Sequence, residues 1–387
     1  MPRTEAADRA GFSWPAAQAA ARREVKARDQ PARRPTTFTA PRLPVTTGLQ
    51  FRGMVLEIED LRTYFETPTG VVPAVDGVSC AIPEGRTLAL VGESGCGKSV
   101  TALSILRLVP PPGRIVGGRI RLRGRDLLTL PEPAMRAIRG NRVAMVFQEP
   151  MTSLNPLLSV ATQVGEALTA HRRASRRGTR HRTIELLERV HLPNPERVAA
   201  AYPHELSGGM RQRVMIAMAL ACEPELLIAD EPTTALDVTV QAEILGLLRD
   251  LQRASGLTVL FITHDFGVVA QVADYVAVMY CGRMVEQAPA RELLAGPRHP
   301  YTRGLLSTRP RLTPSAHERY LPTISGEVPD PRHRPAGCAF HPRCDLGRDD
   351  ARCQQDVPPL RPVDAAHSCA CWKVHAPAEA AARRSPP

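Results

Sequence analysis

Four short apolar runs divide the middle of the chain, and each has the pattern of a buried strand. They are nearly continuous rather than alternating, which is typical of strands covered on both faces of a parallel sheet. The segment that begins at Met54 instead alternates apolar and polar positions, like a half-buried strand. Residues 54 to about 286 are therefore predicted to form an α/β domain. The four runs are Thr87–Val91, Val143–Phe147, Leu226–Ala229 and Thr258–Thr263.

A helical pattern interrupts these strands between about residues 150 and 205. Leu157–Leu168 and Thr183–Val190 carry apolar residues at helical spacing within an otherwise polar stretch. We therefore expect a helical subdomain inserted into a domain that covers residues 54–296.

The two ends of the chain differ from this domain in composition. Residues 1–53 contain six prolines, ten basic and four acidic side chains, and no apolar pattern of useful length. We expect them to form a disordered basic extension rich in Ala, Pro and Arg. Residues 297–372 are rich in Pro, Arg and Cys without a long periodic segment, so a compact fold there would need a staple. Residues 373–387 are predicted to be a disordered tail.

Composition and charge exclude several classes of protein. With 43% hydrophobic and 23% charged residues, the chain is not disordered throughout. The longest apolar run, near Val214–Cys222, is far below the ~20 residues that span a bilayer. Residues 1–20 lack the pattern of a secretory signal. The nine cysteines are therefore expected to sit in a reducing compartment.

The net charge of +11 raises the question of a nucleic-acid partner. Residues 1–53 supply +6 of it, and a further basic run occupies residues 171–182. That run could bind nucleic acid or form a solvated helix or loop. No aromatic side chains that could stack on bases are interleaved with it, which favours the solvated surface. We expect no nucleic-acid partner.

A glycine-rich loop follows the first buried strand and matches the pattern G-x-x-x-x-G-K-[ST]. Its glycines allow successive backbone N–H groups to point inward at phosphate oxygens. Lys98 is one of only three lysines among 50 basic residues, which indicates a need for a compact ammonium group at that place. Lys98 would reach the β- and γ-phosphates and Ser99 would bind Mg²⁺; the alternative is a glycine-rich turn matched by chance. The loop consists of Gly92, Glu93, Ser94, Gly95, Cys96, Gly97, Lys98 and Ser99.

The other three buried strands also end in polar residues. Gln148 follows the second strand, Asp230 and Glu231 follow the third, and His264 follows the fourth. Ligands of parallel sheets bind beyond the carboxyl ends of the strands, so these groups are expected to meet at one edge. Asp230 would suit Mg²⁺ and Glu231 the attacking water. Alternatively, the two acids could begin a helix, since Pro232 follows them.

A second potential anion site lies at Leu206–Gln212. Ser207 can cap a helix from about Met210 to Ala221, and Gly208 and Gly209 leave the amides at its start uncovered. One nucleotide does not need two such cradles from one chain. This helix start is therefore predicted to serve the nucleotide of another subunit.

In order and wording, these motifs resemble the ATP-binding cassette (ABC) family over about residues 54–330. The resemblance implies a P-loop domain with a mixed sheet, and two cassettes that enclose two ATP molecules head to tail. It implies that Glu231 activates water, that His264 holds the γ-phosphate, and that Gln148 contacts ATP and Mg²⁺ and connects them to the membrane subunit. It further implies adenine stacking by Phe65, with Tyr64 as the alternative. Contacts to the partner's nucleotide would come from Ser207, Gly208, Gly209, Gln212 and Asp237.

Finer wording resembles the ATPases of oligopeptide/dipeptide permeases. The segments VGESGCGKS, ELSGGMRQRVMIAMAL, EPMTSLNP and His299–Thr302 carry this resemblance. It implies an ATP-hydrolysing import subunit for dipeptides, oligopeptides or similar solutes, bound at the cytoplasmic face of the inner membrane. The implied partners are two membrane permease subunits, a second ATPase or another copy of this chain, and an extracytoplasmic solute-binding protein.

Two other functions agree less well with the sequence than import. A soluble ABC ATPase of DNA repair or translation usually carries two cassettes or a long coiled-coil insertion, and this chain has neither. A simple kinase has no use for the Leu206–Gln212 cradle.

The C-terminal cysteines resemble those of the same permease ATPases. Four of them in a segment with little apolar core suit a metal staple. Some members of that family hold a [4Fe–4S] cluster there; Zn²⁺ is the rival, although the C-x₂₋₄-C spacing usual for zinc is missing, and unligated thiols remain the third possibility. Cys369 is an extra cysteine in this pattern. The predicted ligands are Cys338, Cys344, Cys353 and Cys371.

Overall fold

The computed structural model describes residues 53–149, 153–171, 178–234, 236–308 and 323–375, all within a compact unit that spans residues 46–387. The predicted N-terminal extension, apart from residue 53, lies outside the described residues, as do residues 376–387 of the predicted tail. The ion pair of Lys373 with Asp350 extends the folded region past the predicted boundary at residue 372. Within the described ranges, no helix has both the length and the apolar character that crossing a bilayer requires.

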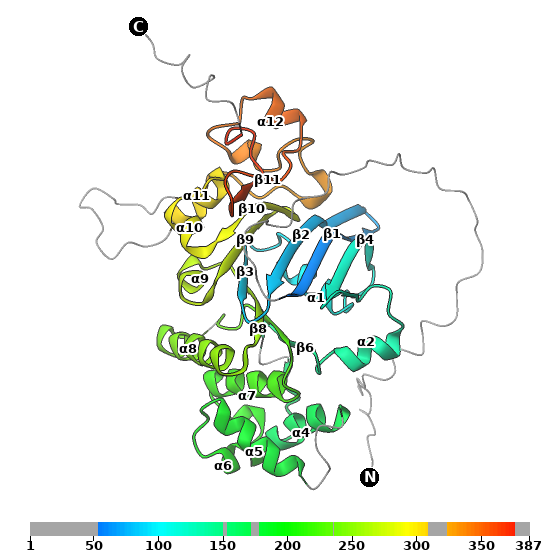
Figure 1. The fold of residues 1–387 in the computed structure, drawn as a ribbon, viewed down its shortest axis with the longest axis vertical. Helices are drawn as coiled ribbons and strands as arrows, with labels where there is room; N and C mark the ends of the chain where they lie inside the picture. Colours follow the sequence, from blue (N-terminus) through cyan, green and yellow to red (C-terminus); the bar gives the residue numbers. More distant parts are fainter. Residues whose placement is uncertain (1–52, 150–152, 172–177, 235, 309–322, 376–387) are drawn as a thin grey trace, which may run out of the picture. The chain divides into compact units, whose positions relative to one another are not determined.

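An eight-stranded sheet forms the centre of the fold (Figure 1), in the order β11-β12-β10-β9-β3-β8-β7-β6. The four predicted strands lie side by side and parallel as β3 (Thr87–Val91), β8 (Thr258–Thr263), β7 (Leu226–Asp230) and β6 (Val143–Val146). Every residue of β3, β7 and β8 is buried, which explains their continuous apolar sequences. The prediction of a parallel core is confirmed.

The same sheet turns antiparallel beyond β9. Strand β9 (Tyr275–Tyr280) is parallel to β3, and β10 (Arg283–Pro289) returns beside β9 through Cys281 and Gly282. Both turn residues have positive φ (45° and 77°), as expected for a tight two-residue hairpin. The sheet is therefore mixed.

A second, antiparallel sheet packs over the phosphate-loop helix. Its strand order is β2 (Gly70–Pro83), β1 (Met54–Thr67), β4 (Gly113–Leu122) and β5 (Arg125–Asp126). Leu56 of β1 and Ile120 of β4 share one core with Ile105 of α1 (Lys98–Ile105) and Leu90 of β3. The alternation that begins at Met54 reflects this one-sided burial, and α2 (Glu132–Ile138) adds to the same core.

Helices occupy the predicted insertion (Figure 1, green). Helix α4 begins only at Val160, after Ser159 accepts a hydrogen bond from the Thr162 N–H group at 3.3 Å. Val164, Leu187 and Val214 meet in one buried cluster, so these helices are held by a common core. The elements are α4 (Val160–Ala170), α5 (Thr179–Arg189), α6 (Pro195–Ala200), the short η3 (Pro203–Glu205) and α7 (Gly208–Leu220).

The remaining helices and strands follow β7 and β10 along the chain. After β7 come α8 (Val238–Ser255) and α9 (Phe266–Val272), and after β10 come α10 (Ala290–Ala295) and α11 (Pro300–Ser307). The rest of the C-terminal region is built from η4 (Pro331–His333), η5 (His341–Arg343), α12 (Ala351–Gln355), β11 (Arg361–Pro362) and β12 (Ser368–Cys369).

The C-terminal region packs onto the central sheet. Strand β12 pairs with β10, and Tyr301 and Phe340 stack around Tyr280 with ring centroids 4.6 and 5.3 Å from it. Buried His367 pairs with buried Glu286 at 2.6 Å. A compact fold here therefore does not depend on a staple alone.

Candidate functional site

The phosphate loop spans the turn between β3 and α1 and requires its glycines. A Cβ atom on Gly92 would lie 2.3 Å from the Met279 carbonyl oxygen, and one on Gly97 would lie 2.3 Å from that of Ala74. Gly97 also has φ of 103°, in the left-handed region. The sequence predicted glycine in this loop for its backbone conformation. The structure adds a second reason, because a backbone carbonyl oxygen lies too close to Gly92 and Gly97 for a side chain.

Lys98 is buried at the base of this loop. Its Nζ donates to the carbonyl oxygens of Gly92 at 2.7 Å and Glu93 at 3.0 Å. Cys96 is buried beside it, and burial raises the pKa of its thiol. Cys96 is therefore a neutral packing residue, while Lys98 brings positive charge to a loop that is exposed at Ser94 and Gly95.

The predicted Mg²⁺ residues meet across two strands. The Ser99 hydroxyl donates to Asp230 Oδ1 at 3.1 Å, and Asp230 is only 4% exposed. Burial raises the pKa of Asp230, and nearby Glu231 adds to this effect. A cleft opens beside the pair, and its lining also includes Gln148 and Phe147. The donor set and the free space suit a hard cation bound with phosphate oxygens.

Because Asp230 has a raised pKa when folded, its contribution to stability is greatest below the unfolded pKa of ~3.9 and is lost as the pH rises through the folded pKa. Asp230→Asn should therefore raise the melting temperature at pH 7 by about 2 °C and weaken Mg²⁺-dependent hydrolysis. Thermal unfolding without nucleotide, with Ser99→Ala as a comparison, measures this. A melting temperature of Asp230→Asn below that of the unaltered chain would contradict the raised pKa of Asp230.

Glu231 is the point where the predicted catalytic residues converge. It accepts a hydrogen bond from Gln148 Nε2 at 3.2 Å, and His264 Nδ1 lies 3.3 Å from its other oxygen. The Thr234 hydroxyl also donates to Glu231 at 3.0 Å. The sequence analysis did not identify Thr234, although it lies only three residues after Glu231. The carboxylate is thus fixed at the strand edge, next to the predicted Mg²⁺ ligand Asp230.

The predicted contacts to a partner's nucleotide lie together on an exposed surface. Ser207 caps α7, with its hydroxyl accepting from the Met210 N–H group at 3.3 Å, and Ser207 and Gly208 are both exposed. A Cβ atom on Gly209 would lie 2.7 Å from Val240 Cγ1, so α7 starts directly against α8. Asp237 caps α8 from this same junction.

Gln212 of this predicted set has a different environment. It is only 1% exposed, on the buried face of α7 one turn beyond Gly208 and Gly209. Its contact with a partner's nucleotide stays a prediction.

The two aromatic side chains that the resemblance offers for adenine stacking have different environments. The Tyr64 hydroxyl donates to Asp76 at 2.9 Å. Phe65 is half-buried and lies against Gly113, where a Cβ atom would approach its ring to 2.6 Å. Phe65 is therefore the better candidate for stacking.

The four predicted cysteine ligands, Cys338, Cys344, Cys353 and Cys371, line one small cavity together with Phe340 and Trp372. We refer to them as the four-cysteine site. A Cβ atom on Gly347 would lie 2.9 Å from Cys353 Sγ and 3.6 Å from Cys344 Sγ, so glycine keeps room beside the sulfurs. Cys369 lies in β12 and does not line this cavity, in agreement with its place as an extra cysteine.

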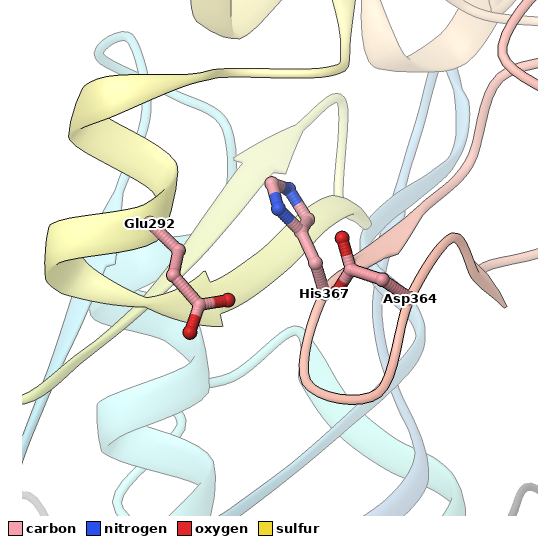
Figure 2. Close-up of side chains that lie close together, drawn as sticks. All are labelled: Glu292, Asp364 and His367. Atoms are coloured by element: carbon pink, nitrogen blue, oxygen red, sulfur yellow. The ribbon is translucent and has the colours of Figure 1, made fainter.

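A different group has the most compact set of potential metal-binding atoms in the described part of the chain (Figure 2). Ligand atoms of Glu292, Asp364 and His367 lie within 4.8 Å of one another. His367 is already paired with Glu286, and Asp364 lies 3.9 Å from Arg298. His367 and Asp364 therefore already have protein partners. The cysteine sulfurs form no group this compact, whereas tetrahedral zinc would hold four sulfurs about 3.8 Å apart.

Two family models match the chain. Residues 75–234 match the model described as ABC transporter, and residues 285–353 match that of the oligopeptide/dipeptide transporter C-terminal region. The second match covers Cys338, Cys344 and Cys353.

Characterised and solved relatives point the same way. A putative peptide import ATP-binding protein of Brucella ovis is 52% identical over 330 residues, covering 83% of this chain and 97% of that protein. The dipeptide transport ATP-binding protein DppD of Bacillus subtilis is 48% identical, covering 82% and 94%. A dimeric ATP-binding cassette bound to ADP and Pi superposes with a TM-score of 0.55 at 29% identity, covering 61% of this chain and 99% of the other.

Proposed function

The chain belongs to the ABC transporter family and is an ATPase, and on this premise we propose that it is the ATP-hydrolysing subunit of a peptide importer. The observation that carries the proposal is the match of residues 285–353 to an oligopeptide/dipeptide transporter region, in a chain where Ser99 contacts Asp230 and Gln148 contacts Glu231. Dipeptides, oligopeptides or similar small solutes are the proposed cargo.

ATP would be held through its phosphates by the loop at Gly92–Ser99. The hydroxyl of Ser99 and the carboxylate of Asp230, 3.1 Å apart, would hold Mg²⁺, which neutralises phosphate charge. Glu231 would take a proton from the attacking water, oriented by Gln148 and Thr234, while His264 steadies the γ-phosphate. The contacts of Gln148, Thr234 and His264 with Glu231 support these proposed roles.

A second subunit would complete each ATP site. Ser207, Gly208 and Asp237 are exposed and lie around the α7–α8 junction, and adjacent Val238 is 85% exposed. An uncovered helix start can bind the phosphate groups of a second subunit's nucleotide, which supports a shared site there. The second ATPase would be a related subunit or another copy of this chain.

The remaining proposed partners are two membrane permease subunits and an extracytoplasmic solute-binding protein, with this chain bound at the cytoplasmic face of the inner membrane. Affinity purification of the full-length chain from its native membrane should recover both permease subunits. Vesicles containing the complex should take up labelled peptide when ATP and the binding protein are supplied. Recovery of a soluble assembly without membrane subunits would overturn the importer proposal.

We also propose that the four-cysteine site holds a [4Fe–4S] cluster with a structural role. Four thiol donors that line one cavity support such a group. The sequence lacks the C-x₂₋₄-C spacing usual for Zn²⁺, which disfavours this rival. A bound cluster would supply four metal–sulfur bonds that link Cys338, Cys344, Cys353 and Cys371.

Anaerobically purified protein should contain about four iron and four sulfide ions per chain. Cys353→Ser should lose most of this content, because it removes a ligand, whereas Cys369→Ser should keep it. Iron, sulfide and zinc assays provide the measurement. Absence of iron, sulfide and zinc would refute a metal site at the four cysteines. Zinc without iron would show that the site binds Zn²⁺ instead of a cluster.

A further inference from the structure

The C-terminal region contacts the phosphate loop through Arg343, which was not among the predicted site residues. Nη1 and Nη2 of Arg343 donate to the two carboxylate oxygens of Glu93 at 2.8 and 3.0 Å. The Arg343 side chain is only 4% exposed, and its Nε donates to the Ser325 carbonyl oxygen at 3.1 Å. This two-pronged ion pair joins residues 250 positions apart and fixes the plane of the guanidinium group.

The backbone of the same loop residue is held as well. The Glu93 N–H group donates to the hydroxyl oxygen of buried Tyr301 at 2.8 Å. Tyr301 packs against Tyr280, whose hydroxyl lies 3.3 Å from Arg343 Nη1. Both the main chain and the side chain of Glu93 are therefore fixed by residues after position 296.

The charge balance of the loop depends on this contact. Lys98 Nζ donates to the Glu93 carbonyl oxygen at 3.0 Å, so Glu93 is part of the cradle that would receive the triphosphate. An unpaired carboxylate there would repel phosphate, whereas the Arg343 pair neutralises it. Arg343 also directly precedes Cys344, so the four-cysteine site and the phosphate loop are connected through one short segment.

We infer that Arg343 is a positioning residue of the ATP site: by neutralising and fixing Glu93, it sets the affinity of the phosphate loop for nucleotide. This inference rests on ATP binding by the family and not on the identity of the transported solute. Arg343 is not placed in contact with the nucleotide and acts only through Glu93.

A double-mutant cycle on the full-length chain tests this, with dissociation constants measured by titration of a fluorescent ATP analogue. Arg343→Gln should weaken binding about tenfold, because it leaves a carboxylate unpaired beside the phosphates. Glu93→Gln should weaken it less, since it removes the carboxylate together with the ion pair. The double variant should bind like Glu93→Gln alone, and therefore more tightly than Arg343→Gln.

Rescue by the second substitution shows that the unpaired Glu93 carboxylate causes the loss of affinity. Thermal unfolding of the same variants, with titration well below each melting temperature, separates this effect from a loss of folding. Arg348→Gln, an exposed arginine of the same region paired with Asp345, should bind nucleotide like the unaltered chain. If Arg343→Gln is too unstable to titrate, Arg343→Lys replaces it, and it should bind less tightly than the unaltered chain. Unchanged affinity in the arginine variant, or losses that simply add in the double variant, would overturn the inference.

Discussion

Replacing Glu231 by glutamine should lower the rate of ATP hydrolysis by about 10²–10⁴-fold while ATP binding changes little. Glutamine is nearly the same size and still offers an oxygen to Gln148 and Thr234, which lie 3.2 and 3.0 Å from the Glu231 carboxylate. It cannot accept the proton of the attacking water. Steady-state turnover and nucleotide titration on the same preparation measure the two quantities separately.

Glu166→Gln provides the matched control, because Glu166 is an exposed carboxylate on α4. It should leave both hydrolysis and binding unchanged. Turnover of Glu231→Gln near that of the unaltered chain would refute the assigned role. A parallel loss of ATP affinity would instead mean that Glu231 mainly shapes the binding site.

Ser207→Arg should lower hydrolysis about 10²-fold and leave the chain's own ATP affinity intact. Ser207 lies at the exposed start of α7, and its hydroxyl caps the helix through the Met210 N–H group at 3.3 Å. Arginine removes the cap and places a long side chain where the partner's γ-phosphate would approach. The defect should therefore appear in the partner's site.

Size-exclusion chromatography with ATP in a Glu231→Gln background measures the defect directly, because the blocked helix start should prevent ATP-dependent pairing. Ser159→Arg is the matched control: Ser159 caps α4 in the same manner, through the Thr162 N–H group, away from the α7–α8 junction. Retained pairing and turnover in Ser207→Arg would argue against shared sites. Equal losses of binding and hydrolysis would do so as well.

Sequence by itself determined the parallel core and the chemistry at its edge. The four apolar runs correspond to β3, β6, β7 and β8 within one residue at each end, since a strand buried on both faces needs a continuous apolar sequence. The contacts of Ser99 with Asp230 and of Gln148 with Glu231 follow, because parallel strands bring their carboxyl ends to one edge. The helix cap at Ser207 is equally local, although α7 begins two residues earlier than expected.

Only the tertiary structure decided which distant groups meet and which side chains of a motif are exposed. Arg343 pairs with Glu93, and His367 pairs with Glu286, because the C-terminal region packs on the sheet. No sequence pattern indicated either pairing. Gln212 belongs to the same motif as Ser207 yet is buried, because the face of α7 that packs inward depends on its neighbours. Local sequence fixes backbone preference and hydrophobic period, whereas contacts between remote segments are set by the packing of whole elements.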